Sequence, residues 1–380
     1  MRDGWIETKL GQYIHINTGK LDVNAASEFG DYPFFTCSRE TYRIDEAAFE
    51  GESVLVAGNG DLNVKYYDGK FNAYQRTYVL NSVDKKTLDN RFLFLFMQTY
   101  IEYLRSETRG TVIQYLKKGQ FTDAKIKLPP LPEQKRIVDL ISSVDSYIEA
   151  LQQQLESAKR SRNAVLHELL TAGGDDWVET TLGEVTQINP EQAKDFDSER
   201  LIKYVDLSTV TFDNGIDSEI DPIPFNEAPG RARRIVREND VIVATVRPYL
   251  KGFAFVNKDF NEQIASTGFC VIRAESELIL PELVWALIGS DDFVDFLVGR
   301  STGSSYPAVR PIDISEFRFM LPPFKDQETV SQLIRTFDQL IKDSTNLINS
   351  TQNLRSGLLS DLLSGAHEIP ASYDKVVGAA

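Results

Sequence analysis

The sequence predicts an α+β protein in which two mixed α/β domains are joined by two long antiparallel helices, with a pseudo-two-fold internal repeat. Two observations predict this fold class. The segment that opens at Leu128-Pro129-Pro130 recurs 193 positions later, where Leu321-Pro322-Pro323 opens a similar run. The start of the chain recurs as well, because residues 3–17 are partly repeated at 175–189. A chain that alternates variable and repeated segments is expected to fold into two similar halves.

The repeat divides the 380 residues into segments with different expected structures. Two variable regions are predicted domains, two repeated segments are predicted long helices, and a short tail follows. In chain order the segments are 1–127 (domain), 128–173 (helix), 174–320 (domain), 321–365 (helix) and 366–380 (tail).

Composition predicts a cytoplasmic protein without a membrane partner. Apolar residues make up 42% and charged residues 26%, which is ordinary for a soluble globular chain. The two cysteines, Cys37 and Cys270, cannot form a disulfide framework and are expected to be small buried side chains. The N-terminus lacks the apolar core of a signal peptide, and the most apolar stretch, Phe92–Met97, is too short to span a bilayer.

The net charge of −15 argues against a simple nucleic-acid binder, because phosphate contacts require lysine and arginine. The charge is unevenly distributed, however. Residues 191–227 carry a net charge of −7, whereas residues 230–252 carry +4. An acidic body can therefore present a basic surface, and it can also suit basic protein partners.

Both repeated segments carry heptads typical of paired helices, but the middle of the second copy is more polar, so that alone it would form a weak coiled coil. Proline favours the start of each helix, and Gly173-Gly174 and Gly365 are expected to end them. A single long helix could instead be a dimerisation element, but the matched second copy favours pairing within the chain. The predicted helix seam consists of Ile137, Ile141, Val144, Ile148, Leu151, Leu155 and Arg162 in the first copy, and Ile334, Phe337, Ile341, Ile348 and Arg355 in the second.

An arginine occupies the same seam position in both copies, at Arg162 and Arg355. Two interpretations are open. The side chain can extend its charged end to solvent from a fraying seam. Alternatively, it can form a polar contact that fixes the register of the helix pair, as single polar seam residues do.

The two variable regions share a plan of strands separated by polar turns. Predicted strands lie at Ser53–Ala57 in the first region and at 240–246, 253–256 and 266–272 in the second. Arginine, asparagine and glutamine recognise base edges in the major groove, while serine, threonine and tyrosine suit phosphates. Each such residue taken alone is an ordinary turn residue, but the set on matching turns favours DNA contact. The candidates are Asn59, Gln75, Arg76, Thr77, Arg231, Arg233, Arg234, Arg247, Tyr249, Lys251, Ser266 and Thr267.

No catalytic motif is present in the sequence. It contains no P-loop, no dinucleotide-binding turn and no Cys/His cluster with zinc spacing. Leu321-Pro322-Pro323-Phe324 is similar to the Asp/Asn-Pro-Pro-aromatic motif of amino-methyltransferases, but leucine stands where the acceptor is needed. We therefore expect no catalytic residue, no metal and no cofactor in this chain.

The chain resembles the specificity (S) subunits of type I restriction–modification systems over nearly its whole length. The resemblance is strongest in the run from Leu128 to Val138, in the helix end 169–173, and in the second copy from Leu321 to Leu363. The runs 51–80 and 239–256 look like variants of the family's target recognition domains. One departure is Lys325-Asp326-Gln327, where the family more often has an acidic residue or proline before Glu-Gln, and it puts the role of that helix entry in doubt.

The resemblance implies a non-catalytic subunit of a restriction endonuclease and adenine-methyltransferase complex. Each variable region would read one half of a bipartite double-stranded DNA target. The helices would set the spacer and dock two methyltransferase (M) subunits, and restriction (R) subunits would join the full complex. S-adenosylmethionine, ATP and magnesium would then bind to the partner subunits only.

Two other classes of function stay open at this point. The acidic charge is compatible with an adaptor that binds no DNA and clamps partner proteins through its paired helices. An autonomous nuclease or methyltransferase would need a catalytic motif that the sequence does not contain.

Overall fold

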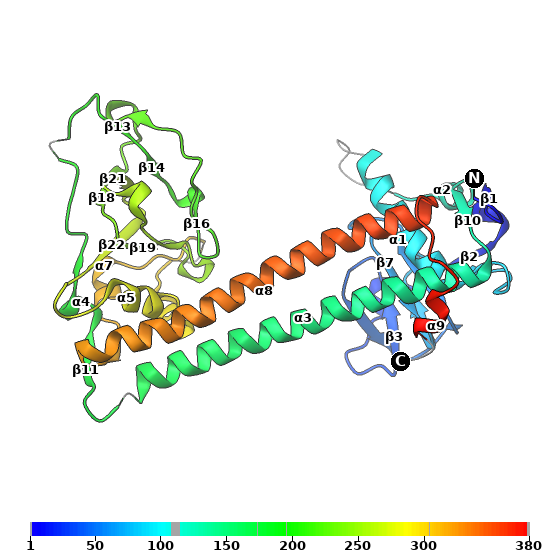
Figure 1. Ribbon diagram of the computed structural model, residues 1–380, viewed down its shortest axis with the longest axis horizontal. Coiled ribbons are helices and arrows are strands. Elements are labelled where there is room, and N and C mark those ends of the chain that lie inside the picture. The colour runs from blue at the N-terminus through cyan, green and yellow to red at the C-terminus, as the bar shows by residue number, and fades with distance from the viewer. Residues whose placement is uncertain (1, 108–114, 173, 195, 304, 378–380) are drawn as a thin grey trace. The chain divides into compact units, whose positions relative to one another are not determined.

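The computed structural model describes residues 2–107, 115–172, 174–194, 196–303 and 305–377 (Figure 1). The chain divides into two compact units. Unit 1 comprises residues 1–152 and 347–380, and unit 2 comprises residues 153–346. Two 41-residue helices, α3 (Leu131–Thr171) and α8 (Phe324–Ser364), each contribute residues to both units.

The two long helices predicted from the repeat are confirmed. Helix α8 ends beside Gly365, whose φ of +76° favours glycine because it has no Cβ. Helix α3 ends at Thr171, and the predicted stop at Gly173 lies outside the described residues. In the described part of the chain, no helix is both long and apolar enough to cross a membrane.

Unit 1 is built around a four-stranded antiparallel sheet with the order β2-β9-β6-β7. Its strands are β2 (Ile14–Thr18), β9 (Thr77–Ser82), β6 (Ser53–Ala57) and β7 (Val64–Tyr67). A second sheet has the order β4-β3-β8-β5, formed by β4 (Thr41–Ile44), β3 (Tyr32–Phe35), β8 (Lys70–Ala73) and β5 (Phe49–Glu50). The helices of this domain are α1 (Asn90–Glu107) and α2 (Lys118–Thr122).

Unit 2 contains a sheet with the corresponding order β12-β22-β19-β20. Its strands are β12 (Thr186–Ile188), β22 (Phe269–Ala274), β19 (Val241–Ala244) and β20 (Phe253–Phe255). A three-stranded sheet follows the order β14-β21-β18, from Tyr204–Val205, Gln263–Ser266 and Ala232–Val236. Two short ribbons pair β13 (Leu201–Ile202) with β17 (Ile223–Pro224), and β15 (Val210–Thr211) with β16 (Gly215–Ile216). The helices are α4 (Leu182–Val185), α5 (Pro281–Ile288), α6 (Asp291–Arg300) and α7 (Pro311–Ser315).

The central strands β6 and β19 are buried on both faces because each sheet separates two apolar cores. Val54 and Val56 of β6 face the core that contains α1, whereas Leu55 belongs to the core on the other side. In β19, Val243 faces the core of α5 and α6, and Ile242 faces the opposite core. Successive side chains of a strand point to opposite faces, so a continuous apolar run satisfies both cores.

Strand β6 matches its prediction, while the predicted strand at 266–272 is confirmed only from Phe269 onward, as part of β22 (Phe269–Ala274). The chain changes sheets at Thr267-Gly268, so that β21 ends at Ser266 and β22 begins at Phe269. Gly268 interrupts the β-favouring residues at this point, but a single glycine inside such a run does not reveal that the chain moves to another sheet. The other two predicted strands are shorter than expected, as β19 (Val241–Ala244) and β20 (Phe253–Phe255).

Each long helix is preceded by a two-stranded antiparallel ribbon and is held by a buried glutamine in its first turn. Strand β1 (Ile6–Lys9) pairs with β10 (Lys125–Leu128) before α3, and β11 (Val178–Thr181) pairs with β23 (Arg318–Leu321) before α8. The glutamines are Gln134 and Gln327, and both side chains are fully buried.

The two glutamines make the same contacts. Gln134 Nε2 donates to the carbonyl oxygens of Thr87 at 2.8 Å and Pro129 at 2.9 Å, and its Oε1 accepts from Asp89 N at 2.9 Å. In the second copy, Gln327 Nε2 donates to Leu278 O at 2.9 Å and Pro322 O at 3.2 Å, while Leu280 N donates to Gln327 Oε1 at 2.8 Å. The departure at Lys325-Asp326-Gln327 therefore leaves this helix entry intact.

The seam arginines are held by aspartates from the other long helix. Arg162 is only 7% exposed, and its Nε donates to Asp338 Oδ1 at 2.6 Å. In the other unit, Arg355 Nη2 donates to Asp145 Oδ2 at 2.9 Å, and Arg355 Nε also contacts this carboxylate. Both guanidinium groups are therefore held by a carboxylate of the other helix rather than extended into solvent. All twelve predicted seam residues are buried or half-buried.

The described part of the C-terminal tail belongs to unit 1 and includes α9 (Tyr373–Val377). Ile369 is 5% exposed and belongs to the same apolar core as α1. Arg2 Nη1 donates to His367 O at 2.8 Å and also pairs with Glu368 at 3.1 Å. The N-terminal and C-terminal segments of the chain are therefore joined within one unit.

Replacing Gln134 with alanine is expected to destabilise unit 1 by about 2–4 kcal/mol, because it leaves buried backbone groups without partners. Urea unfolding would measure the loss. Gln154→Ala is the matched control, since Gln154 lies on the same helix with an exposed side chain and should change stability little. Equal effects of the two substitutions would contradict the importance of the buried amide.

Candidate nucleic-acid interface

In unit 1 the predicted DNA-contacting residues lie where strands of the central sheet end. Asn59 follows β6 and forms an isolated bridge with Tyr115. The neighbouring turn between β8 and β9 carries Gln75 and Arg76, both exposed, and is tied to β6 by a bond from Gly58 N to Arg76 O at 2.8 Å. Gln75, Arg76 and Tyr115 line one pocket of about 310 Å³.

Tyr115 was not predicted as a site residue. Its ring lies 5.3 Å from the guanidinium carbon of Arg76, and its side chain is 55% exposed. Thr77, by contrast, is 1% exposed inside β9. Its side chain does not reach the surface, so the structure gives no support to a DNA contact by Thr77.

Three candidates of unit 2 lie on neighbouring backbone segments that are joined by hydrogen bonds. They are Arg231, Thr267 and Arg247. Thr267 N donates to Arg231 O at 2.8 Å, and Thr245 N donates to Gly268 O at 2.9 Å. Arg247 lies two residues after Thr245, with its own N donating to Pro307 O at 2.7 Å. The structure therefore places these three candidates at neighbouring strand ends.

Arg247 is held in an unusual conformation. Its φ is +50°, in the left-handed region that non-glycine residues seldom adopt. Its guanidinium carbon lies 4.4 Å from the ring centroid of Tyr306, and its Nη2 donates to Ser305 O at 3.2 Å. Strained residues of this kind cluster at ligand-binding sites.

The remaining candidates of unit 2 are not all part of this strand-end site. Arg233 is exposed and Arg234 half-buried on β18, whereas Ser266 is 1% exposed. Tyr249 and Lys251 line a separate pocket of about 440 Å³ with Arg162 of α3. Lys251 Nζ pairs there with Asp291 Oδ1 at 2.9 Å, so its charge is already neutralised within the unit.

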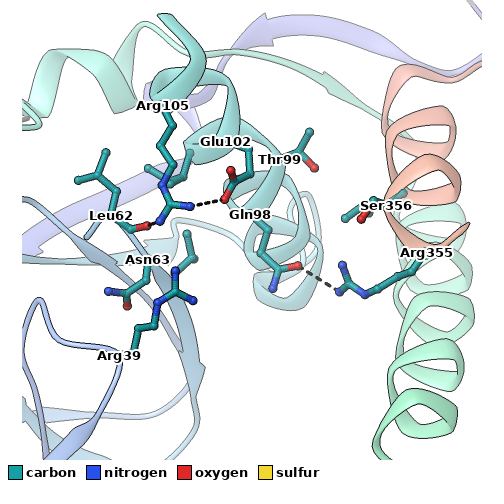
Figure 2. Close-up of a pocket in the computed structure, with 12 residues that line it drawn as sticks. Arg39, Leu62, Asn63, Gln98, Thr99, Glu102, Arg105, Arg355 and Ser356 are labelled. Atoms are coloured by element: carbon teal, nitrogen blue, oxygen red, sulfur yellow. Dashed lines mark hydrogen bonds and ion pairs between the residues drawn. The ribbon is translucent and has the colours of Figure 1, made fainter. Parts of the chain in front are cut away.

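The corresponding pocket of unit 1 has a volume of about 400 Å³ and lies between α1 and α8 (Figure 2). It is lined by Arg39, Gln98, Glu102 and Arg355, among others. Gln98 Oε1 accepts from Arg355 Nη2 at 3.2 Å, so the seam arginine contacts both the other long helix and the domain. Heptad position alone did not reveal this second contact.

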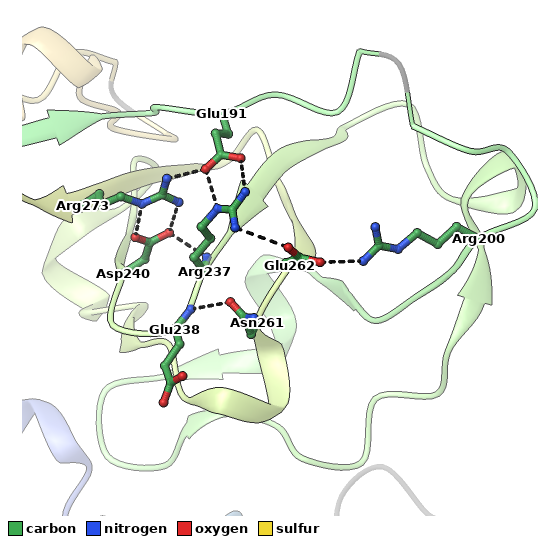
Figure 3. A network of polar contacts seen from close by, with 8 residues as sticks. All are labelled: Glu191, Arg200, Arg237, Glu238, Asp240, Asn261, Glu262 and Arg273. Atoms are coloured by element: carbon green, nitrogen blue, oxygen red, sulfur yellow. Dashed lines mark hydrogen bonds and ion pairs between the residues drawn. The ribbon is translucent and has the colours of Figure 1, made fainter.

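A network of arginines and carboxylates braces the start of β19 in unit 2 (Figure 3). Asp240 is 1% exposed and accepts two bonds of 2.8 Å from the Arg273 guanidinium. Glu191 accepts bonds of 2.6 and 2.8 Å from Arg237 and also contacts Arg273. The basic stretch 230–252 therefore offers fewer free cations than its composition indicates, because Arg237 and Lys251 are both ion-paired.

The same network lowers the pKa of Glu191 to about 2, first through hydrogen bonding to Arg237 and then through Arg273.

Cys270 is buried away from this network, and burial raises the pKa of its thiol to about 12. Cys270 is thus a small buried side chain, as expected from the sequence. In the described residues, no group of three His, Cys, Asp or Glu side chains is placed to hold a metal ion.

Comparisons with known proteins agree with this architecture. A family model described as "Type I restriction modification DNA specificity domain" matches residues 2–160. The chain is 27% identical to the type I restriction enzyme EcoDI specificity subunit of Escherichia coli, over 98% of this chain and 94% of that protein. It is 22% identical to the MjaVIII specificity subunit of Methanocaldococcus jannaschii, over 96% and 93% of the two chains.

The fold matches as well. A crystal structure of the type I restriction–modification S subunit from M. genitalium superposes with a TM-score of 0.59, at 18% identity, over 94% of this chain and 96% of that one. This likeness supports the mixed α/β fold with two domains and long helices. The chain is thus similar over nearly its whole length to specificity subunits of type I restriction enzymes.

The low pKa of Glu191 predicts a contribution to stability that depends on pH. The folded pKa lies below the ordinary value of 4.5, so the contribution is complete above pH 4.5 and is lost as pH falls toward 2. Glu191→Gln should destabilise unit 2 at pH 7 by about 1 kcal/mol, a value discounted for partial exposure. The gap between wild type and variant should narrow between pH 4.5 and 2.

Urea unfolding at several pH values would measure this gap. Glu238→Gln is the matched control because the Glu238 side chain is exposed and points away from the network in Figure 3. A gap that stayed constant down to pH 2 would contradict the proposed role of the Glu191 carboxylate.

Proposed function

We propose that this chain is the DNA sequence-specificity subunit of a type I restriction–modification complex, with each unit reading one half of a bipartite target. The observation that carries the proposal is that both units place arginine and polar side chains at the ends of equivalent strands. In unit 1 these side chains belong to Asn59, Gln75 and Arg76, and in unit 2 to Arg231, Arg247 and Thr267. Base edges are read by such side chains.

We further propose that α3 and α8 pack antiparallel as a pseudo-two-fold pair that fixes the spacer between the half-sites. Within unit 2 the contact is Arg162 with Asp338, and within unit 1 it is Arg355 with Asp145. The residues of each pair are related to those of the other by the 193-position repeat. An arginine from each copy thus pairs with the aspartate of the other copy, as a two-fold relation requires.

The partners of this proposal are two M subunits, and R subunits in a full cytoplasmic complex. Support comes from an exposed apolar stripe on α8 at seven-residue spacing, formed by Leu333, Leu340, Leu347 and Leu354 with exposed fractions of 44–69%. Such a stripe is suited to cover by helices of a partner. The chain itself would perform no catalysis, and S-adenosylmethionine, ATP and magnesium would bind to the partner subunits.

A protein-clamping adaptor that binds no DNA is the second candidate, favoured by the net charge of −15. The two candidates differ in one measurement. A specificity subunit gives its assembled complex a DNA affinity that falls as salt rises, because phosphate contacts release counterions. An adaptor gives the complex no such salt-dependent affinity.

Exchanging residues 1–127 for the corresponding segment of another specificity subunit is expected to change one half of the methylated target and leave the other half unchanged. The reason is that the first strand-end site lies wholly within these residues. Genome-wide methylation mapping in a host that carries the exchanged chain and its M subunits would measure the result. An unchanged target would contradict the proposal.

Shortening both long helices by one heptad should shorten the preferred spacer by about 10 Å, or about three base pairs. The deletion removes residues 148–154 and 341–347, which lie between the two Arg–Asp pairs on each helix, so both pairs and the seam register are kept. Methylation mapping again gives the spacer length.

The matched control keeps the length of both helices. It replaces the exposed residues of the same two heptads with alanine and should leave the spacer unchanged. If the shortened chain assembled and methylated a target with the original spacer, the helices would not set the distance.

A further inference from the structure

Each unit contains one arginine stacked on an exposed tyrosine at its strand-end site. Arg76 lies over Tyr115 at 5.3 Å, and Arg247 lies over Tyr306 at 4.4 Å. The tyrosines are 55% and 68% exposed, so a large part of each ring remains at the surface. Exposed tyrosines that hold a cation in place are well suited to a recognition surface.

The two stacks are built from non-equivalent arginines. Gly58 N donates to Arg76 O in unit 1, and Thr245 N donates to Gly268 O in unit 2, so the counterpart of Arg76 is Gly268. Arg247 instead lies in the turn after β19. The equivalent turn of unit 1 is the one that follows β6. The fold shared by the two units therefore does not by itself dictate an arginine–tyrosine stack.

The tyrosines, in contrast, come from equivalent segments. Tyr115 forms a bridge with Asn59 after β6, and Ala308 forms a bridge with Val246 after β19. Tyr306 is two residues before Ala308, in the bend that leads into this bridge. The same segment of each unit thus supplies an aromatic ring to whichever neighbouring turn carries the arginine.

An aromatic partner leaves the arginine able to read DNA. In the described residues several cations of unit 2 are ion-paired, among them Arg237, Arg273 and Lys251, whereas Arg247 forms no ion pair. Cation–π stacking fixes the plane of a guanidinium while its N–H groups stay in that plane as donors. A fixed planar fork matches the O6 and N7 acceptors of guanine in the major groove.

The backbone strain at Arg247 also supports a role of this residue in ligand contact. Its positive φ and its buried Nε, which has no partner among the described residues, make this conformation costly for the unit. Such a cost is typical of positions that contact a ligand.

We propose that Tyr115 and Tyr306 are specificity-determining positioning residues, each holding its arginine to read one guanine in one half of the DNA target. This inference rests on the proposed function. It adds that each half-site contains a G·C pair whose recognition depends on a tyrosine as well as on an arginine.

The test uses the full chain assembled with its M subunits. The probes are a duplex with the bipartite target found by methylation mapping and a set in which each base pair of both half-sites is replaced in turn. Tyr115→Ala should reduce discrimination at one G·C pair by roughly 3- to 30-fold, in the half-site of unit 1 only. Tyr306→Ala should do the same in the other half-site.

Further variants separate positioning from a general structural role. Tyr115→Phe keeps the ring and should retain discrimination, whereas Arg76→Lys keeps the charge but loses the planar fork and should not. The double variant Arg76→Ala/Tyr115→Ala should discriminate no worse than Arg76→Ala alone, because the two residues act as one unit. Tyr103→Ala is the matched control, since Tyr103 is 54% exposed on α1 and stacks on Tyr100.

Two results would overturn the inference while leaving the proposed function in place. One is a normal bipartite target at which Tyr115→Ala and Tyr306→Ala keep wild-type discrimination. The other is an equal loss of affinity for every duplex, which indicates a structural defect. A wild-type complex without any bipartite preference would overturn the proposed function together with this inference.

Discussion

The arrangement of each unit depends on a buried glutamine at the first turn of a long helix. Gln134 and Gln327 use both donors and the acceptor of one amide to join the helix entry to the loop before α1 or α5. A buried amide is stable only when its hydrogen bonds are satisfied, so the direction of the helix relative to the sheet of its own unit is tightly specified. The apolar core of each unit then packs between a helix and a sheet whose relative direction is already fixed.

The crossed Arg–Asp pairs add a second constraint, on the register of the helix seam. Arg162 is nearly inaccessible, and a buried guanidinium without a carboxylate would be strongly destabilising. A slide of one helix along the other by a single turn would separate Arg162 from Asp338. Apolar seam residues such as Ile148 and Ile348 tolerate such a slide far better, because contacts between aliphatic side chains are not directional. We therefore propose that the pairs specify register more than they add stability.

The sequence was most informative where periodicity carries the signal. The heptads and the repeat predict α3 and α8, and the apolar run at Ser53–Ala57 predicts β6, because these patterns follow from which faces are buried. The partners of Arg162 and Arg355 could not be predicted from the seam positions, since Asp338 and Asp145 lie on the other helix. The change of sheet at Thr267 was missed for a similar reason, because strand propensity does not depend on which neighbour the strand pairs with.

In the candidate site, too, local features were predicted from the sequence and tertiary contacts were not. Polar residues at turns were recognisable, and Arg76 and Arg247 do lie at strand ends. Their tyrosine partners were missed because Tyr115 and Tyr306 are distant in the sequence and have no motif of their own. Burial of Thr77 and neutralisation of Arg237 by Glu191 likewise arise from tertiary contacts that single-sequence patterns do not contain.

The net charge of the chain also affects how much it can contribute to base specificity and how much to overall DNA affinity. With a net charge of −15 and several of its arginines held by carboxylates, this chain as a whole attracts phosphates weakly. An arginine held by an aromatic ring, however, keeps its donors without adding a carboxylate that would repel the DNA backbone. Selective recognition of a base requires one well-placed guanidinium, whereas non-specific affinity requires many mobile cations. Under the proposed function, the acidic chain would therefore determine which sequence is read, and partner subunits would supply most of the attraction to the DNA backbone.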